Sequence, residues 1–154
     1  MINDPKIDNV ELLLGCLNCT VQLSALKGFK CNPILRELGE SIRTELKAIG
    51  SDISHLNMTL VPEVDVNGVA TLMGSKLPQF ELGPELDEPV ERGRLNLNIR
   101  AQAKPDHLHA AVTRAMNHTW GVFPNLFARL AEMQHYQPPS VPAPSSVAVS
   151  RELS

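Results

Sequence analysis

The feature that most restricts the fold is a strict alternation between residues 94 and 101, which read RLNLNIRA. Successive side chains of a β-strand point to opposite faces, so this alternation predicts a strand with one apolar and one polar face. The apolar positions are Leu95, Leu97, Ile99 and Ala101, and the polar positions are Arg94, Asn96, Asn98 and Arg100. Strands of this kind are typical of antiparallel sheets that pack one face on a core and leave the other in water or under polar contacts.

Helical patterns lie on both sides of this strand. Between Asn32, a candidate N-cap, and Gly50, a candidate C-terminal glycine, apolar residues recur at helical spacing. They are Ile34, Leu35, Leu38, Ile42, Leu46 and Ile49. A second helix is expected from Pro105, with Asp106 in its first turn. Its apolar stripe is Leu108, Ala111, Val112, Ala115 and Thr119. A third, shorter helix is predicted from Asn125 to Gln134.

Two further strands are expected between the first two helices. Leu56, Met58 and Leu60 alternate with polar residues, and residues 69–73 supply a returning strand. Between them, the Asn-Gly of residues 65–68 (DVNG) favours a type I′ hairpin turn. Residues 77–93 contain three prolines and predict a long irregular connection. Near the N-terminus, Val10, Leu13, Leu14 and Leu17 fit one face of a helix.

This order of elements predicts an α/β (α+β) fold. We expect a two-layer sandwich, in which a three- to four-stranded, largely antiparallel sheet carries helices on one face. Three zones follow from the patterns: a cysteine-containing N-terminal segment (1–31), the α/β domain (32–136) and a tail (137–154). The tail is rich in proline and serine, a composition that predicts disorder.

Composition limits the classes of function. Hydrophobic residues make up 43% of the 154 residues and charged residues 20%, which suits one globular domain. A formal net charge of −3 argues against a surface that coats nucleic acid. No apolar run reaches the roughly 20 residues of a membrane span, and no secretion signal is visible. These features predict a cytoplasmic protein that does not act on membranes.

The phosphate-binding loop is absent from the sequence. Residues 68–76 (GVATLMGSK) have the wrong glycine spacing and place Ser before Lys, so no nucleotide site is expected. Five acidic residues, Glu81, Glu85, Asp87, Glu88 and Glu91, are best explained as a solvated loop. An enzyme that uses this acidic loop together with His55 remains the least favoured alternative. His107 and His109 are expected on different faces of a helix, where one ion cannot bind both.

The cysteines carry the strongest chemical signal. Cys16 and Cys19 are three positions apart, and two thiolates at this spacing can bind one soft divalent ion from a turn or a helical face. Zinc usually takes four ligands, and Cys16 and Cys19 supply only two of them. Cys31 is therefore a candidate for the third ligand. The sequence therefore suggests a site for zinc or another transition metal at Cys16, Cys19 and Cys31. Buried structural thiols are the alternative explanation.

Residues 11–20 (ELLLGCLNCT) resemble the E-x-x-x-G-C-x-C-C-T/S metal motif of CobW-type metallochaperone GTPases, with Asn18 in place of the middle cysteine. Residues 37–56, 86–90, 94–101 and 134–138 look like the region that follows the GTPase domain in part of that family. The resemblance implies a stand-alone relative of the accessory domain, linked to zinc or cobalt handling. The magnesium aspartate and the guanine-reading N-K-x-D are missing, so GTP hydrolysis is not implied.

Two main functions remain open. The first is a non-catalytic accessory domain that binds a protein partner, such as a metal-delivery GTPase or its client, with the cysteine metal site as an added hypothesis. The second is a metal-independent module for protein interaction or homo-oligomerisation.

Overall fold

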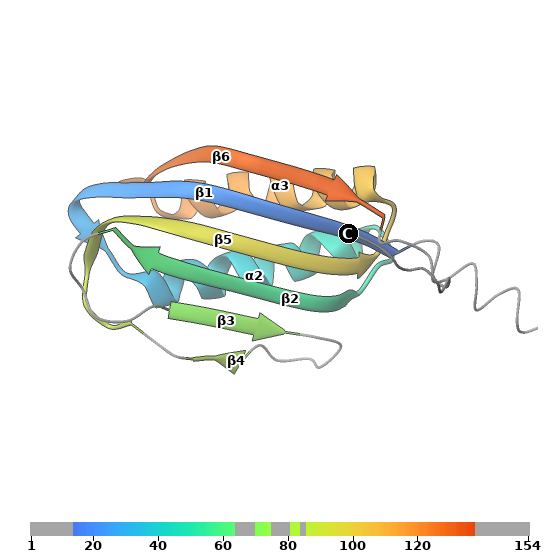
Figure 1. Ribbon diagram of the computed structural model, residues 1–154, viewed down its shortest axis with the longest axis horizontal. Helices are drawn as coiled ribbons and strands as arrows, with labels where there is room; N and C mark the ends of the chain where they lie inside the picture. Colours follow the sequence, from blue (N-terminus) through green and yellow to red (C-terminus); the bar gives the residue numbers. More distant parts are fainter. Residues whose placement is uncertain (1–13, 64–69, 75–80, 84–85, 138–154) are drawn as a thin grey trace, which may run out of the picture.

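The alternating segment forms β5 (Val90–Gln102), which lies inside an antiparallel sheet with six strands among the residues that the structure describes. The computed structural model describes residues 14–63, 70–74, 81–83 and 86–137. Within them the chain runs through β1 (Leu14–Phe29), α2 (Cys31–Ala48), β2 (Ile53–Pro62), β3 (Ala70–Gly74), β4 (Glu81–Leu82), β5, α3 (Pro105–Val122) and β6 (Phe127–Tyr136). The strand order is β4-β3-β2-β5-β1-β6 (Figure 1).

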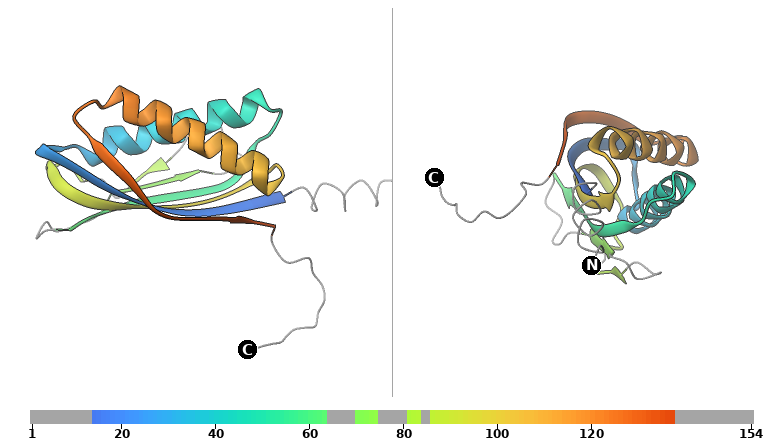
Figure 2. Two further views of the ribbon diagram at one scale, coloured as in Figure 1. Left: turned by 90° about the horizontal axis from the view of Figure 1, so that it is seen from above. Right: turned by 90° about the vertical axis from the view of Figure 1, so that its right-hand side faces the viewer.

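The two helices lie side by side on one face of the sheet (Figure 2). α2 joins β1 to β2, and α3 joins β5 to β6, so the two strand–helix–strand units interleave in the sheet. This is the split βαβ arrangement of ferredoxin-like folds, here with β3 and β4 inserted between β2 and β5. The predicted α+β sandwich with helices on one face is confirmed, although the sheet has six strands rather than three or four.

The core fills the space between the sheet and the two helices. From α3, all five residues of the predicted stripe are buried. From α2, the buried aliphatic residues are Ile34, Leu35, Leu38, Ile42 and Leu46, whereas Ile49 is exposed. The apolar face of β5 is buried as predicted, and β2 adds Leu56, Met58 and Leu60. On β3 the buried residues are Ala70 and Leu72.

The ends of α2 match their predicted chemistry only in part. Gly50 has a φ of +75°, and the amides of Gly50 and Ser51 donate to the carbonyls of Lys47 and Leu46, which is a Schellman motif. The N-cap residue, however, is Lys30 rather than Asn32. Asn32 lies inside the first turn, and its side chain accepts from the Leu86 amide and donates to Asp87. It therefore ties the chain before β5 to the helix.

Two predicted helices are wrong. Leu14 and Leu17 belong to β1, whereas Val10 and Leu13 lie outside the described residues, and residues 127–136 form β6. The predicted boundary at residue 31 does not separate two parts of the molecule, because β1 lies inside the sheet and pairs with both β5 and β6. The connection at 77–93 also contains β4 and the start of β5.

Some predictions fall on residues outside the described ranges. The turn at 65–68 and nearly all of the tail are among them, although β2 and β3 do pair as adjacent antiparallel strands. Neither α2 nor α3 is long and apolar enough to cross a membrane.

Candidate functional site

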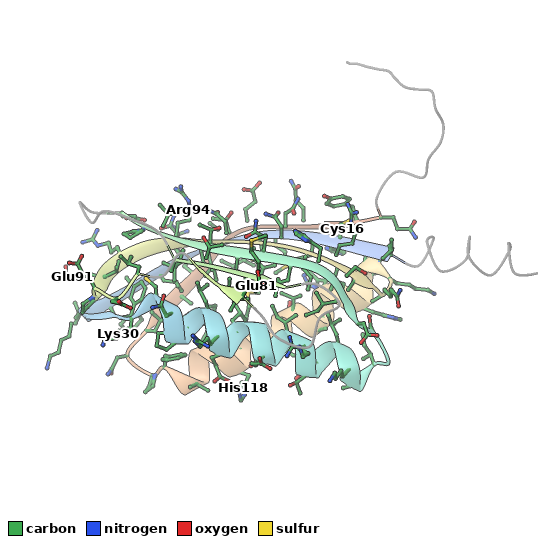
Figure 3. The ribbon with its side chains drawn as sticks, turned by 90° about the horizontal axis from the view of Figure 1, so that it is seen from below. Cys16, Lys30, Glu81, Glu91, Arg94 and His118 are labelled. Carbon is green, nitrogen blue, oxygen red and sulfur yellow. The ribbon has the colours of Figure 1, made fainter. Side chains whose placement is uncertain are left out.

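The predicted metal ligands lie in three different settings. Cys16 and Cys19 are both on β1, and residues three apart on a strand face opposite sides of the sheet. Cys19 faces the helices, where its Sγ lies 4.0 Å from the Sδ of Met116 on α3. Cys16 lies on the opposite side of the sheet, as does Arg94 (Figure 3). Cys31 begins α2 and is fully buried.

Burial also disfavours the thiolate form of two of these cysteines. It raises the pKa of Cys19 and of Cys31 from 9.0 to about 11, because a thiolate loses its hydration there. Metal binding needs the deprotonated sulfur. Across the described ranges, no group of three or more His, Cys, Asp or Glu side chains is arranged to hold a metal ion. The structure thus does not bring the three predicted ligands together.

The histidines and the acidic residues are spread over the molecule. His55 lies opposite Arg100 in the β2–β5 register, whereas Glu91 lies nine residues earlier on β5, which is roughly 30 Å away. Asp87 accepts a hydrogen bond from Asn32, and Glu85 lies outside the described residues. His55 and Glu91 therefore do not share a site.

The histidines of α3 lie near other groups. His118 Nε2 is 3.3 Å from Glu37 on α2, so this pair joins the two helices. His109 packs its ring on His135 of β6, with ring centroids 4.6 Å apart, and His135 Nε2 is 3.1 Å from Asp106. These contacts connect α3 to its neighbours on both sides. His107 is exposed on the same helix.

Polar side chains from four strands line up on the helix-free face of the sheet. Strand pairing aligns Asn57, Asn98, Asn18 and Gln134 in one row across β2, β5, β1 and β6. A second row consists of Thr59, Asn96 and Thr20 on β2, β5 and β1. We call these seven residues the amide platform. Arg94 and Arg100 lie on the same face of β5, on either side of the two rows.

Hydrogen bonds and a hollow mark the part of the amide platform between β5 and β6. The Thr20 hydroxyl donates to Asn96 Oδ1 at 3.2 Å, and Asn18 Nδ2 donates to the Tyr136 hydroxyl at 3.3 Å. A depression of about 340 Å³ opens here. Its polar lining consists of Asn18, Thr20, Asn96, Asn98, Glu132 and Gln134.

The side chains of this face can form hydrogen bonds with a bound molecule. Amide side chains donate and accept hydrogen bonds at once, and threonine hydroxyls do the same. Such groups pair with uncharged polar partners, for example the backbone of another polypeptide. The amide platform provides them in two parallel rows on the sheet, with Asn57 Oδ1 buried and without a hydrogen-bond partner among the described residues.

The sequence pattern predicts only part of this face. It predicts the polar side of β5, including Asn96 and Asn98, but not the contributions of Asn18, Asn57 and Gln134 to the same surface. For β1 the signal was present, since the polar residues Asn18, Thr20, Gln22 and Ser24 alternate with buried ones. The alignment across strands depends on the register, which local patterns do not reveal.

No protein-family model matches this chain, and no relative is found among curated proteins.

Proposed function

We propose that this chain is a non-catalytic accessory domain that binds a protein partner through the amide platform. The observation that carries the proposal is the alignment of four amide side chains across β2, β5, β1 and β6 on the face that the helices leave uncovered. One face of the sheet packs against the two helices and forms the core, whereas the helices leave the other face uncovered. The proposal assigns this second face to recognition.

The size and charge of the amide platform favour a polypeptide as ligand. Neighbouring strands lie about 4.8 Å apart, so a row that crosses four strands extends over about 14 Å. This length matches four or five residues of an extended peptide. The seven side chains carry no charge, and the formal net charge of the chain is −3, so the amide platform itself offers no cation to a nucleic-acid backbone.

The resemblance to CobW-type accessory domains suggests which partner to test first. A metal-delivery GTPase or its client is the first candidate to purify and titrate. In this proposal the domain holds the partner and needs no metal of its own, because the thiols are buried on different sides of the sheet.

The first experiment maps the contact surface. A photo-crosslinking amino acid replaces Asn98, at the centre of the amide platform, in cells that naturally make the protein. The matched control places it at Asn117, an exposed asparagine on α3. We expect a discrete protein adduct from position 98 and none from position 117, and mass spectrometry then identifies the partner.

The second experiment measures affinity with the purified partner. Asn98→Arg places a long charged side chain on the platform and should weaken binding at least tenfold, or about 1.4 kcal/mol, while Asn117→Arg leaves it unchanged. Calorimetric titration gives both constants. Equal binding by the two variants, or equal adducts from the two positions, would refute the proposal.

A further inference from the structure

The two edges of the sheet are built very differently. β4, at one edge, is only two residues long, and short edge strands are a common protection against unwanted pairing. β6, at the other edge, has ten residues, and β1 is its single strand partner among the residues that the structure describes. The outer edge of β6 thus offers a long row of backbone donors and acceptors.

β6 also exposes large apolar side chains, which a second strand beside it would cover. Phe127 is 67% exposed, Leu130 50% and Tyr136 42%. Only Ala128 and Met133 pack partly against the core. Large exposed apolar side chains on an edge strand favour a contact with another strand.

The charges on β6 are arranged for pairing with a second copy of the same strand. Arg129 lies opposite Gln22 and Glu132 opposite Thr20 in the β1–β6 register, and a bulge at Ala131 separates these two pairs. Because of the bulge, Arg129 and Glu132 both lie on the helix-free face although they are three residues apart. A second copy of β6 can pair antiparallel with the first, related to it by a two-fold axis that passes between Leu130 and Ala131. This arrangement places Arg129 of each copy opposite Glu132 of the other.

The remaining residues fit this register. It places Ala128 opposite Met133, both on the helix side, and Phe127 opposite Gln134, both on the helix-free side. Shifting the second strand by one residue would oppose side chains from different faces. Shifting it by two residues loses the direct Arg129–Glu132 pairs.

We infer that two copies of this chain pair through β6 in an antiparallel, two-fold symmetric contact, with reciprocal Arg129–Glu132 ion pairs. Pairing of the two β6 strands joins the two sheets into one. Directly opposed residues of paired strands share a face, so the helix-free faces of the two copies are continuous. Both amide platforms then lie on the same side of the joined sheet. The dimer does not require the proposed partner, so either proposal can fail without the other.

The test uses charge reversal on the full-length chain, followed by sedimentation over a range of concentrations. We expect the unaltered chain to show a concentration-dependent monomer–dimer equilibrium. Arg129→Glu or Glu132→Arg alone opposes like charges at both symmetric positions and should raise the dimer dissociation constant roughly tenfold. Both residues are exposed, so the variants should keep the circular dichroism spectrum of the unaltered chain.

Mixing the two single variants tests whether complementary charges restore the pairing. Arg129→Glu carries two acidic residues at these positions and Glu132→Arg carries two basic ones, so each is the complement of the other. We expect the mixture to form a heterodimer at least as tight as the unaltered dimer. A chain that stays monomeric at high concentration would overturn the inference. A dimer that charge reversal does not weaken, or that Asn98→Arg disrupts instead, would also overturn it.

Discussion

Gly15 lies where β1 passes close to the connection between β5 and α3. A Cβ atom at this position would lie 2.5 Å from the carbonyl oxygen of Ala103 and 3.2 Å from the nitrogen of Pro105. Both are backbone atoms, so neither can rotate away as a flexible side chain would. The glycine that precedes Cys16 is therefore explained by close packing of two backbones, without reference to a metal.

We predict that Gly15→Ala destabilises the protein by about 1–3 kcal/mol, the usual cost of overpacking. Gly121→Ala is the matched control, because a Cβ there meets nothing within 4 Å and alanine is favoured over glycine in a helix. This variant should be as stable as the parent, or up to about 1 kcal/mol more stable. Urea unfolding followed by circular dichroism measures the free energy of unfolding of both variants. Equal values would show that the backbone at Ala103 moves to accommodate the added methyl group.

The thiols lead to a second prediction at this scale. Burial raises the pKa of Cys19 and Cys31 to about 11, so in the folded protein both stay protonated at neutral pH and ionise only as the pH rises toward that value. We expect no cobalt–thiolate absorption when the reduced, folded protein is titrated with Co²⁺ at pH 7.5. The same titration in 6 M guanidinium chloride serves as the control, since the exposed thiols can bind there. Intense absorption in the folded state, lost in Cys16→Ser and Cys19→Ser, would re-establish the metal site.

At the scale of elements, the predictions succeeded where the hydrophobic period was complete. β5, α2 and α3 each bury one uninterrupted stripe, so the sequence pattern matches the burial in the fold. β1 shows the same period of two, with Leu17, Cys19, Val21, Leu23 and Ala25 buried. Its first residues nevertheless fit a helical spacing with Val10 and Leu13, and the spacing of Cys16 and Cys19 also fits a pair of metal ligands.

β6 could not have been recognised from its pattern. It is an edge strand, so most of its side chains are exposed, and burial imposes little alternation on them. The bulge at Ala131 then shifts the order of faces by one residue. As a result Leu130 and Met133 are three residues apart on the same side of the sheet, which imitates helical spacing.

The polar row of the candidate site cannot be predicted from local patterns either, because Asn18 and Asn57 become neighbours of Asn98 only through strand pairing.

The fold as a whole makes β1 indispensable, although the sequence suggested a separate segment before residue 32. β1 lies between β5 and β6 and supplies Leu17, Val21 and Leu23, each at most 2% exposed. Burying a side chain of this size contributes about 1.5–3 kcal/mol, and a domain of this kind is stable by only about 5–15 kcal/mol. Removing the strand also leaves unpaired backbone groups along β5 and β6.

We therefore predict that a chain beginning at residue 32 does not fold, whereas a chain that ends at Gln137 keeps its fold. The difference follows from where the residues lie: the first deletion takes away a strand from inside the sheet, and the second removes only residues after β6 whose composition predicts a tail. Circular dichroism and the dispersion of amide signals in a proton–nitrogen NMR spectrum distinguish the two outcomes. A chain from residue 32 with dispersed signals and cooperative unfolding would mean that β5 and β6 can close the sheet without β1, and that the first zone is an independent segment after all.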